Sequence, residues 1–482
     1  MVQGTSSWAG KSLLTTVLCR HFARQGLRVA PFKAQNMSNN ARVAARGDAG
    51  QVGEIGTAQW LQARAARAAP HVRMNPVLVK PEGETRSQVI VDGVADPALS
   101  ALPWRCRGPR LRPVVERALT GLLREADLVV LEGAGSPAEI NLTDVDLANT
   151  AAAQIAGAPV LLVADIDRGG AFAHLYGTWA LLDPPARERI AGFVLNKFRG
   201  DASLLAPAPQ RLTELTGVPV LGVVPMLRHD LPDEDGAAEP AQHPGTGRPV
   251  VAVVRYPYAS NLDEFKPLEQ VARLHWARTP GGLADADLVV LPGSKHVAAD
   301  LRWLRSTGLA DAVVGRARAG RRVLGICGGL QMLGTTLQDD GGRDGDVDGL
   351  GLLGLHTSYR ADKVVADVRT RLAPDLRGPW QGLAGQWLHG YEIRHGRTEP
   401  TATATQRTGD QPAEALPAQR GWHCGPVLGL TVHGLFENPR LVQALLGRAP
   451  ERSLDAAIDD LTDSVVPHLD ITHLERLAGM ST

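Results

Sequence analysis

The sequence predicts an α/β protein of two domains, each built on a parallel sheet with flanking helices. Short apolar runs of buried-strand length alternate with helical stretches along the chain, a rhythm typical of parallel α/β sheets. Near the middle, residues 233–249 are acidic, then rich in Pro and Gly, and they interrupt this alternation. A chain of 482 residues is also too long for one ordinary hydrophobic core.

The interruption sets the expected domain boundaries. We place an N-terminal domain at residues 1–232, a linker at 233–249 and a C-terminal domain at 250–448. The remaining residues, 449–482, form a C-terminal tail with an amphipathic helical pattern, and we expect this tail only to pack against the rest of the chain.

Composition narrows the class of protein. Hydrophobic residues make up 44% of the chain and charged residues 21%, as in soluble globular proteins. The 51 basic residues balance the 51 acidic ones, so charge gives no argument for a nucleic-acid or membrane partner. The four cysteines include no CxxC pair, which argues against a zinc site or a disulfide framework. No apolar run reaches the ~18 residues of a membrane span. We therefore expect a cytoplasmic protein.

The N-terminal domain opens with MVQGTSSWAGKS, a glycine-rich turn, followed by a predicted helix. Backbone N–H groups at a helix start, a lysine and a hydroxyl group form a cradle for phosphate and Mg²⁺. The spacing departs from the standard motif by one residue, but the following helix and strand favour a nucleotide site. The predicted nucleotide-binding residues of this loop are Gly4, Thr5, Gly10, Lys11 and Ser12. The strand before the loop, residues 1–3, is either very short or begins upstream.

Three residues of this domain are candidates for a metal shell. Ser12 provides a hydroxyl in the phosphate loop. Glu132 ends a buried strand, where a carboxylate can reach Mg²⁺ on a phosphate or, alternatively, cap the chain end. Glu54 is expected in the first turn of a helix that starts at residues 53–59, where it either compensates the helix dipole or holds the metal.

Other polar positions of the first half point to a ligand. Residues 31–40 are rich in amide side chains, which suit a polar ligand better than a core. Asn196 and Lys197 end a strand and form a pair that often contacts the nucleotide base in phosphate-loop folds. Asp146 either caps a nearby helix or faces a substrate. Further strands are expected at residues 74–81, 87–91, 127–131, 160–165, 190–196 and 218–225.

The C-terminal domain contains a candidate nucleophile. Its strands begin at residues 250–254, and in VLGICGGLQMLG, residues 323–334, an apolar strand meets a glycine turn that carries Cys327. A nucleophile on a strand-to-helix elbow needs small neighbours, and the helix start lowers the thiol pKa. The backbone N–H of Gly328, with a second one near Gly293, would form an oxyanion hole. The alternative is a buried structural cysteine in an ordinary turn.

A cysteine nucleophile needs a base, and His433 is the best-placed candidate. It follows a predicted strand and directly precedes Gly434. The rival histidines are His389, His395 and His423.

The second half resembles the class I, triad-type glutamine amidotransferases on its elbow, Gly325-Ile-Cys327-Gly-Gly329, and on His433. The resemblance implies that Cys327 attacks the side-chain amide of glutamine and releases ammonia. The third member of that triad is usually a glutamate two residues after the histidine, where this chain has Leu435. This departure is typical of the cobyrinic-acid amidase branch, and Glu437 is one candidate to orient His433.

The first half resembles dethiobiotin-synthetase-like ATPases, which activate a carboxylate as an acyl phosphate. Taken together, motifs over nearly the whole chain resemble the cobyric acid synthase family. These motifs lie at residues 4–12, 31–37, 53–56, 75–80, 87–91, 196–200, 325–329 and 389–393.

The resemblance implies a cytoplasmic amidating enzyme that uses ATP, Mg²⁺ and glutamine. Its expected reaction converts four peripheral carboxylates of adenosylcobyrinic acid a,c-diamide into amides and gives adenosylcobyric acid. Its partners are then small molecules, and the sequence leaves its oligomeric state open. Two alternatives remain: a cobyrinic acid a,c-diamide synthase, and a ParA-like ATPase switch with a decayed second domain.

Overall fold

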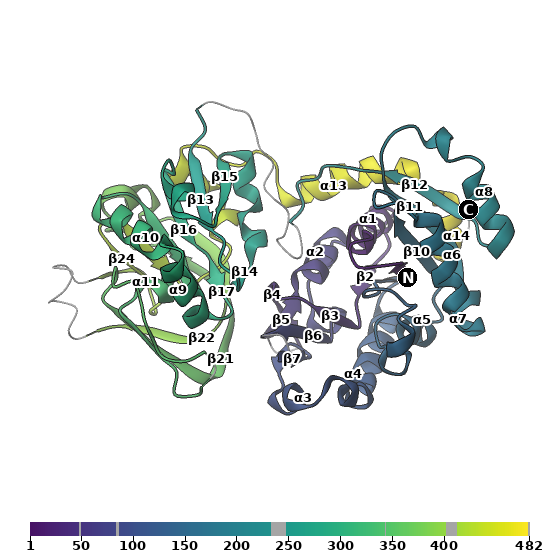
Figure 1. Ribbon diagram of the computed structural model, residues 1–482, viewed down its shortest axis with the longest axis horizontal. Helices are drawn as coiled ribbons and strands as arrows, with labels where there is room; N and C mark the ends of the chain where they lie inside the picture. The colour runs from purple at the N-terminus through teal and green to yellow at the C-terminus, as the bar shows by residue number, and fades with distance from the viewer. Residues whose placement is uncertain (48–49, 83–85, 233–246, 343, 402–411, 481–482) are drawn as a thin grey trace. The chain divides into compact units, whose positions relative to one another are not determined.

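The computed structural model describes residues 1–47, 50–82, 86–232, 247–342, 344–401 and 412–480. Most of the predicted linker and part of the charged loop after residue 81 lie outside this described part. The chain divides into two compact units (Figure 1). Unit 1 comprises Met1–Ser38, Ala44–Leu231 and Ser453–Thr482, and unit 2 comprises Asn39–Val43 and Pro232–Arg452. The chain therefore passes between the units four times. The segment 39–43, predicted in the N-terminal domain, belongs to unit 2, and the tail, predicted as a separate part, belongs to unit 1.

Unit 1 is built around parallel strands. Its main sheet has the order β1-β10-β11-β12, and β2 pairs with β9 in parallel. A single bridge between Val2 and Glu132 joins the end of β9 to β1. The strands are β1 (Val2–Gly4), β2 (Val29–Phe32), β9 (Leu128–Leu131), β10 (Val160–Asp165), β11 (Ile190–Phe198) and β12 (Val220–Pro225). Because the ends of parallel strands share one edge, the loops that follow them gather there.

Helices and a smaller mixed sheet complete the globular part of unit 1. The helices are α1 (Lys11–Arg24), α2 (Thr57–Ala65), α3 (Pro97–Ala101), α4 (Trp104–Glu125), α5 (Thr150–Ala156), α6 (Ala171–Leu181), α7 (Pro184–Glu188) and α8 (Ala208–Thr216). The second sheet has the order β3-β6-β7-β8, with β3 (Gln35–Met37), β6 (Val77–Pro81), β7 (Ser87–Val91) and β8 (Val94–Ala95). Two further strands form a two-stranded sheet: β4 (Ala41–Arg46), whose first three residues belong to unit 2, and β5 (Gln51–Gly56).

The prediction that Glu54 lies in the first turn of a helix is wrong. Glu54 lies inside β5, and α2 begins three residues later at Thr57. The backbone N–H of Glu54 donates to the carbonyl of Gly93, and the buried carboxylate is paired with Lys80. Partners distant in sequence thus hold this segment extended, and local propensity alone does not reveal them.

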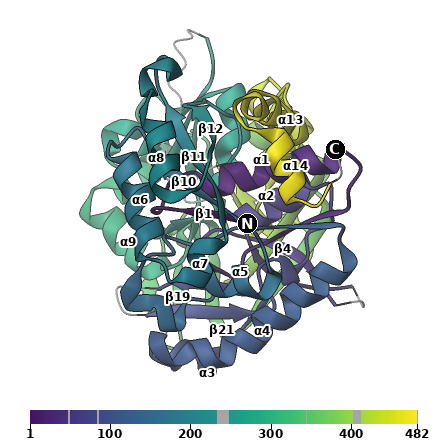
Figure 2. The same cartoon turned by 90° about the vertical axis from the view of Figure 1, so that its right-hand side faces the viewer.

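The C-terminal tail forms α13 (Leu454–Val465) and α14 (Ile471–Leu477) and packs within unit 1. Figure 2 shows both helices beside α1. Apolar side chains of α13, among them Ile458 and Leu461, join the core cluster that contains Leu14 of α1. The helical, amphipathic tail expected from the sequence is therefore present, and its apolar face closes a core of unit 1.

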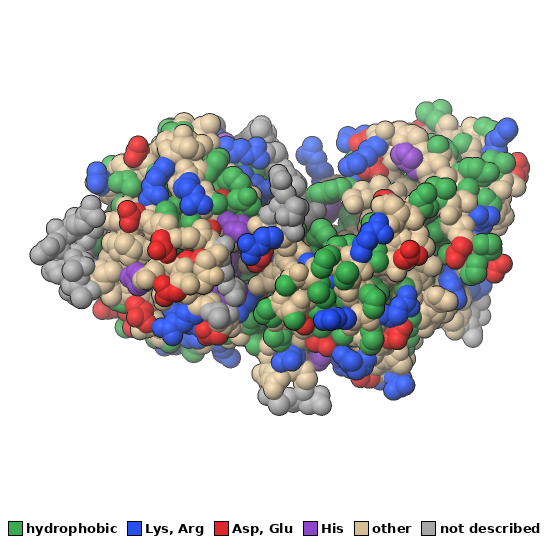
Figure 3. All heavy atoms as spheres, turned by 60° about the horizontal axis from the view of Figure 1, so that its bottom comes forward, with side chains coloured by type: hydrophobic (Ala, Val, Ile, Leu, Met, Phe, Trp, Pro, Cys, Tyr) green, Lys and Arg blue, Asp and Glu red, His purple; other side chains and the backbone are tan. Residues whose placement is uncertain are grey.

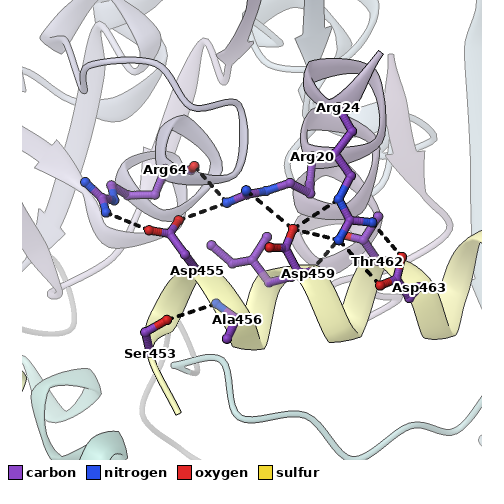
Figure 4. A network of polar contacts seen from close by, with 10 residues as sticks. Arg20, Arg24, Arg64, Ser453, Asp455, Ala456, Asp459, Thr462 and Asp463 are labelled. Atoms are coloured by element: carbon purple, nitrogen blue, oxygen red, sulfur yellow. Dashed lines mark hydrogen bonds and ion pairs between the residues drawn. The ribbon is translucent and has the colours of Figure 1, made fainter. Parts of the chain in front are cut away.

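Ion pairs reinforce this packing (Figure 4). Arg20 of α1, which is buried, lies 2.9 Å from Asp455 and 3.4 Å from Asp459. Arg24 contacts Asp459 at 2.7 Å and Asp463 at 2.5 Å. The three aspartates follow one another at intervals of four residues, which places them on one face of α13.

Unit 2 is built around a sheet with the order β15-β13-β16-β18-β25-β24-β23, in which the first five strands are parallel and the last two antiparallel. The strands are β13 (Val250–Val254), β15 (Arg273–Ala277), β16 (Leu288–Leu291), β18 (Val323–Ile326), β23 (Ala413–Leu416), β24 (Gly421–Cys424) and β25 (Val427–Leu430). Val251 and Val253 point to one core and Ala252 and Val254 to another, so both faces are covered. The predicted α/β class with parallel sheets is confirmed.

Helices and a long antiparallel pair surround this sheet. The helices are α9 (Val297–Ser306), α10 (Leu309–Arg318), α11 (Gly328–Leu333) and α12 (Pro439–Leu446). The strands β21 (Leu355–Arg371) and β22 (Trp387–Pro400) form the long ribbon at the lower left of Figure 1.

On the face drawn in Figure 3, basic and acidic side chains are interspersed. Among the described residues, the helices include none that is both long and apolar enough to cross a membrane.

Candidate active sites

Cys327 lies at the turn between β18 and α11 in unit 2. Its backbone has φ 51° and ψ −105°, in the region that favours glycine. Non-glycine residues held there store strain, and such strain is characteristic of nucleophile elbows. The next two residues leave no room for side chains: a Cβ on Gly328 would lie 2.6 Å from the Ser294 nitrogen, and one on Gly329 would lie 1.9 Å from the Leu291 carbonyl oxygen.

The Cys327 thiol and the His433 side chain are electrostatic partners, and each shifts the pKa of the other. Burial alone would raise the pKa of Cys327, but the neighbouring imidazole lowers it below its ordinary value. Burial likewise opposes protonation of His433, yet Glu264 and Cys327 raise the pKa of His433 to about 10. The geometry therefore favours a thiolate beside an imidazolium.

Glu264 is the carboxylate that bonds to the far side of this imidazole. Its Oε1 atom lies 2.9 Å from Nδ1 of His433, and its Oε2 accepts a hydrogen bond of 2.8 Å from the Gly434 backbone. Glu264 is fully buried in the 3-10 segment η4 (Leu262–Gln270). A carboxylate in this position fixes the imidazole tautomer and stabilises its protonated form. Sequence reasoning missed it, because 169 residues separate it from His433.

Glu437, the candidate from the sequence for orienting His433, instead forms an ion pair of 2.5 Å with Arg42. The rival histidines lie on other strands, His389 and His395 on β22 and His423 on β24. The structure thus brings Cys327 together with His433, the histidine preferred from the sequence.

The two glycines predicted to form an oxyanion hole lie beside this pair. Gly293 belongs to β17 (Gly293–Ser294), and a Cβ there would lie 2.9 Å from Cε1 of His433. Gly328 directly follows the cysteine and approaches Ser294 closely, as its missing side chain permits. Both predicted residues therefore border the thiol–imidazole pair, in the region where a substrate carbonyl would meet backbone N–H groups.

In unit 1 the phosphate-binding loop connects β1 to α1. Gly10 has φ 100°, and a Cβ at that position would lie 1.9 Å from Nδ2 of Asn196. A Cβ on Gly4 would lie 3.0 Å from Nζ of Lys11. The backbone conformation of Gly10 therefore favours glycine, and the space at Gly4 is tight. The Lys11 ammonium donates to the carbonyls of Ser6 at 2.9 Å and Gly135 at 3.0 Å.

The other predicted nucleotide-binding residues support the same loop. Thr5 donates its backbone N–H to Val163 of β10. Asn196 donates 2.9 Å to the carbonyl of Ala9, and Lys197 donates 2.6 Å to that of Trp8. Lys197 also lies 2.8 Å from Asp165. These hydrogen bonds of Asn196 and Lys197 hold the loop in shape, and contact with a nucleotide base stays a prediction.

Glu132 is a buried carboxylate that contacts Ser12 at the end of the loop. Its Oε1 atom accepts hydrogen bonds of 2.8 Å from both Ser12 and Lys33, and Gln62 donates to Oε2. Burial would raise the pKa of Glu132, but the Lys33 ammonium and the hydrogen-bond donors lower it. Ser12 and Glu132 therefore offer two adjacent oxygens of the hard type that Mg²⁺ prefers. Sequence reasoning did not identify Lys33 or Gln62 as neighbours of Glu132.

The remaining two predicted positions, Glu54 as a metal ligand and Asp146 as a substrate contact, already have partners within the protein. The carboxylate of Glu54 is paired with Lys80, so it has a cation partner of its own. Asp146 accepts backbone hydrogen bonds from Ala148, Asn149 and Thr150 at the start of α5, as in the capping alternative. Within the described residues no group of three or more His, Cys, Asp or Glu side chains could hold a metal. A metal here would depend on further oxygens, such as those of a phosphate.

Comparison with known proteins defines the class first. Residues 1–235 match the family model of the CobQ/CobB/MinD/ParA nucleotide binding domain, and residues 250–441 match that of the CobB/CobQ-like glutamine amidotransferase domain. The chain thus combines a nucleotide-binding domain with a glutamine amidotransferase domain.

Two curated relatives then define the family. The chain is 53% identical to a cobyric acid synthase of Polaromonas sp. (strain JS666 / ATCC BAA-500), over 99% of this chain and 97% of the relative. It is 56% identical to a cobyric acid synthase of Paracidovorax citrulli (strain AAC00-1), over 96% of each. The chain belongs to the cobyric acid synthase family.

Proposed function

We propose that this chain catalyses the glutamine-dependent, ATP-driven amidation of four peripheral carboxylates of adenosylcobyrinic acid a,c-diamide, giving adenosylcobyric acid. The observation that carries the proposal is one chain with two separate sites: a thiol–imidazole–carboxylate group in unit 2 and a phosphate-binding loop in unit 1. The assignment of a corrinoid as the substrate rests on the membership of the chain in the cobyric acid synthase family.

In unit 2 the Cys327 thiolate attacks the side-chain amide carbon of glutamine. The backbone N–H groups at Gly293 and Gly328 stabilise the oxyanion, and the His433 imidazolium gives its proton to the leaving nitrogen, so ammonia departs and a thioester forms. Water, deprotonated by His433, then attacks the thioester and releases glutamate and the free thiol. Glu264 keeps the imidazole oriented through both steps.

In unit 1 a substrate carboxylate is made reactive by phosphorylation. One of its oxygens attacks the γ-phosphorus of ATP, forming an acyl phosphate and ADP. Ammonia then attacks the acyl carbon, the C–O bond to the phosphate breaks, and the products are an amide and inorganic phosphate. Lys11 and the loop N–H groups stabilise negative charge on the transferred phosphoryl group.

The bound metal, Mg²⁺, would neutralise phosphate charge, and Ser12 with Glu132 would hold it. The Lys33 ammonium beside Glu132 fits this assignment, because it keeps the carboxylate ionised at neutral pH. Glu54 is the weaker of the proposed ligands, since Lys80 already balances its charge. Asp146, if it meets the corrinoid, does so while capping α5.

Product analysis tests the proposal. Purified protein is incubated with ATP, Mg²⁺, glutamine and adenosylcobyrinic acid a,c-diamide, and the corrinoid is followed by mass spectrometry. Each replacement of OH by NH₂ lowers the mass by about one dalton, and four successive decreases are expected. A parallel incubation with cobyrinic acid separates this activity from that of an a,c-diamide synthase. An absence of amidated products would contradict the proposal, and glutamine hydrolysis would exclude the alternative of an ATPase switch with a decayed second domain.

A further inference from the structure

A five-residue segment from the N-terminal part of the chain belongs to unit 2. Residues up to Ser38 and from Ala44 onward are part of unit 1, whereas Asn39–Val43 cluster with unit 2. The chain therefore enters unit 2 and leaves it again within a few residues, close in sequence to the predicted ligand-contacting stretch 31–40.

Arg42 is the charged residue of this segment, and it is buried. Its guanidinium lies 2.5 Å from Asp263 and 2.5 Å from Glu437, and it stacks 5.0 Å above the centre of the Tyr391 ring. Nearby, Asn40 accepts a hydrogen bond of 2.7 Å from the backbone of Asn261. One arginine thus joins three elements of unit 2: η4, β22 and the 3-10 turn η8 (Leu435–Glu437).

Two of the three partners of Arg42, Asp263 and Tyr391, adjoin the residues that contact His433 or contact it themselves. Asp263 precedes Glu264, the carboxylate bonded to His433. The Tyr391 ring stacks on the imidazole with centroids 5.3 Å apart, and the backbones of Tyr391 and His433 exchange two hydrogen bonds. A shift of the guanidinium would therefore act on both the carboxylate side and the ring face of His433.

The charges make this arrangement sensitive to Arg42. Asp263 and Glu264 are buried carboxylates, and a third carboxylate, that of the partly exposed Glu437, interacts electrostatically with both; the guanidinium contacts Asp263 and Glu437. Only Glu264 then remains to pair with His433. Without the guanidinium, two further carboxylates would either repel Glu264 or take up protons.

We propose that Arg42 is a positioning residue of the glutaminase site, and that the segment 39–43 transmits the ligand state of unit 1 to the Cys327–His433 pair. The inference rests on the proposed function, since it requires a nucleotide and a corrinoid in unit 1. Because a residue covalently continuous with unit 1 contacts the partners of His433, movement of the flanking residues of unit 1, Ser38 and Ala44, changes the alignment of the imidazole.

The test compares Arg42→Met and Arg42→Lys with wild type. Glutamate release is measured with and without ATP, Mg²⁺ and the diamide, and amidation is measured separately with free ammonia. We expect wild-type glutaminase to accelerate when the unit 1 ligands are added. Arg42→Met should lower glutaminase kcat at least tenfold and lose the acceleration, with the ammonia-dependent rate within twofold of wild type. Arg42→Lys, which keeps the charge, should recover part of both.

A pH profile separates positioning from general damage. With the guanidinium removed, extra negative charge near the thiol disfavours the thiolate, so the acid limb of glutaminase kcat/KM should move to higher pH in Arg42→Met. The charged or titratable groups that interact with the pair or with Glu264 are Tyr256, Asp263, Glu264, Lys295, Tyr359, Tyr391, Arg394 and Glu437.

Arg316→Met provides the matched control. Arg316 is also a buried arginine of unit 2, but it donates to the backbone carbonyls of Leu283 and Ala286. This variant should retain the wild-type profile and acceleration even if its stability falls. The inference would be overturned if folded Arg42→Met had the glutaminase kinetics of the wild type. It would also be overturned if the glutaminase rate of the wild type did not change when the unit 1 ligands were added. If the wild type did not amidate the diamide with free ammonia, that result would instead contradict the proposed function.

Discussion

In unit 2 the buried carboxylate of Glu264 bonds to an imidazole, whereas in unit 1 the buried carboxylates of Glu132 and Glu54 contact lysine ammonium groups. The imidazole of His433 has the Cys327 thiol as a second partner with which it can exchange a proton, whereas the carboxylates of Glu132 and Glu54 pair with lysine ammonium groups, which stay protonated until high pH. Unit 2 is therefore arranged to move protons, and unit 1 to hold fixed charge around a phosphate. The comparison teaches that the partner of a buried acid indicates the chemistry of its site.

Removal of the nucleophile should separate the two sites most sharply. Cys327→Ala should lower glutamine-dependent amidation by about 10³-fold or more, since no other group replaces the thiolate. Amidation with free ammonia should persist, because the phosphate-binding loop is in unit 1. Both rates are measured on the same preparation, with circular dichroism as the control for folding. A folded variant that has lost both activities would contradict the division of labour.

The corresponding variant in unit 1 removes the positive charge of Lys11 from the phosphate-binding loop. Lys11→Met should lower amidation by about 10²–10³-fold with either glutamine or ammonia, because it removes a cation from the transferred phosphoryl group. Glutamine hydrolysis measured without ATP should stay within twofold of wild type. The matched control, Lys266→Met, alters an ion pair with Glu269 in unit 2 and should leave amidation intact. Normal amidation by Lys11→Met would remove the loop from the mechanism.

Neutralising Glu264 tests the proton-moving side of the comparison. Glu264→Gln should lower glutaminase kcat/KM by about tenfold to 10²-fold, and it should lower the pKa of His433 from about 10. Activity that needs the imidazolium is lost as pH rises through this pKa, so the alkaline limb of the profile should move to lower pH.

The same substitution has a stability consequence. Because the pKa of His433 is higher in the folded protein than in the unfolded chain, protonation of His433 stabilises the folded state. This stabilisation is fully present below the pKa of the unfolded chain and is lost as pH rises through about 10. The difference in unfolding free energy between wild type and Glu264→Gln should therefore be larger at pH 6 than above pH 10. Glu269→Gln, on the same 3-10 segment, is the control for both experiments. An unchanged alkaline limb in Glu264→Gln would show that another group sets it.

Local motifs account for what the sequence predicted. The elbow at Cys327 and the loop at Lys11 are each formed by neighbouring residues whose glycines meet steric limits at close range. The pairing of Glu264 with His433 spans 169 residues, and the pairing of Lys33 with Glu132 spans 99, so neither leaves a local pattern. The sequence predicts Glu54 on a helix, whereas it lies on β5, because contacts with the distant residues Gly93 and Lys80 hold this strand.

The smallest expected effect concerns charge that serves neither site. Asp459→Ala removes contacts to Arg20 and Arg24 where α13 packs on α1. Because Asp459 is one-third exposed, solvent screens these pairs, and we expect unit 1 to lose about 1 kcal/mol of unfolding free energy.

This loss should shrink in high salt, since mobile ions weaken partly exposed pairs. Urea unfolding at low and high salt measures it, with Asp460→Ala on the same helix as the control, and glutaminase activity should not change. A salt-independent loss would indicate that Asp459 acts through packing. A change in glutaminase rate would show that the tail influences the glutaminase site of unit 2, although it packs within unit 1. The two sites would then not be independent of each other.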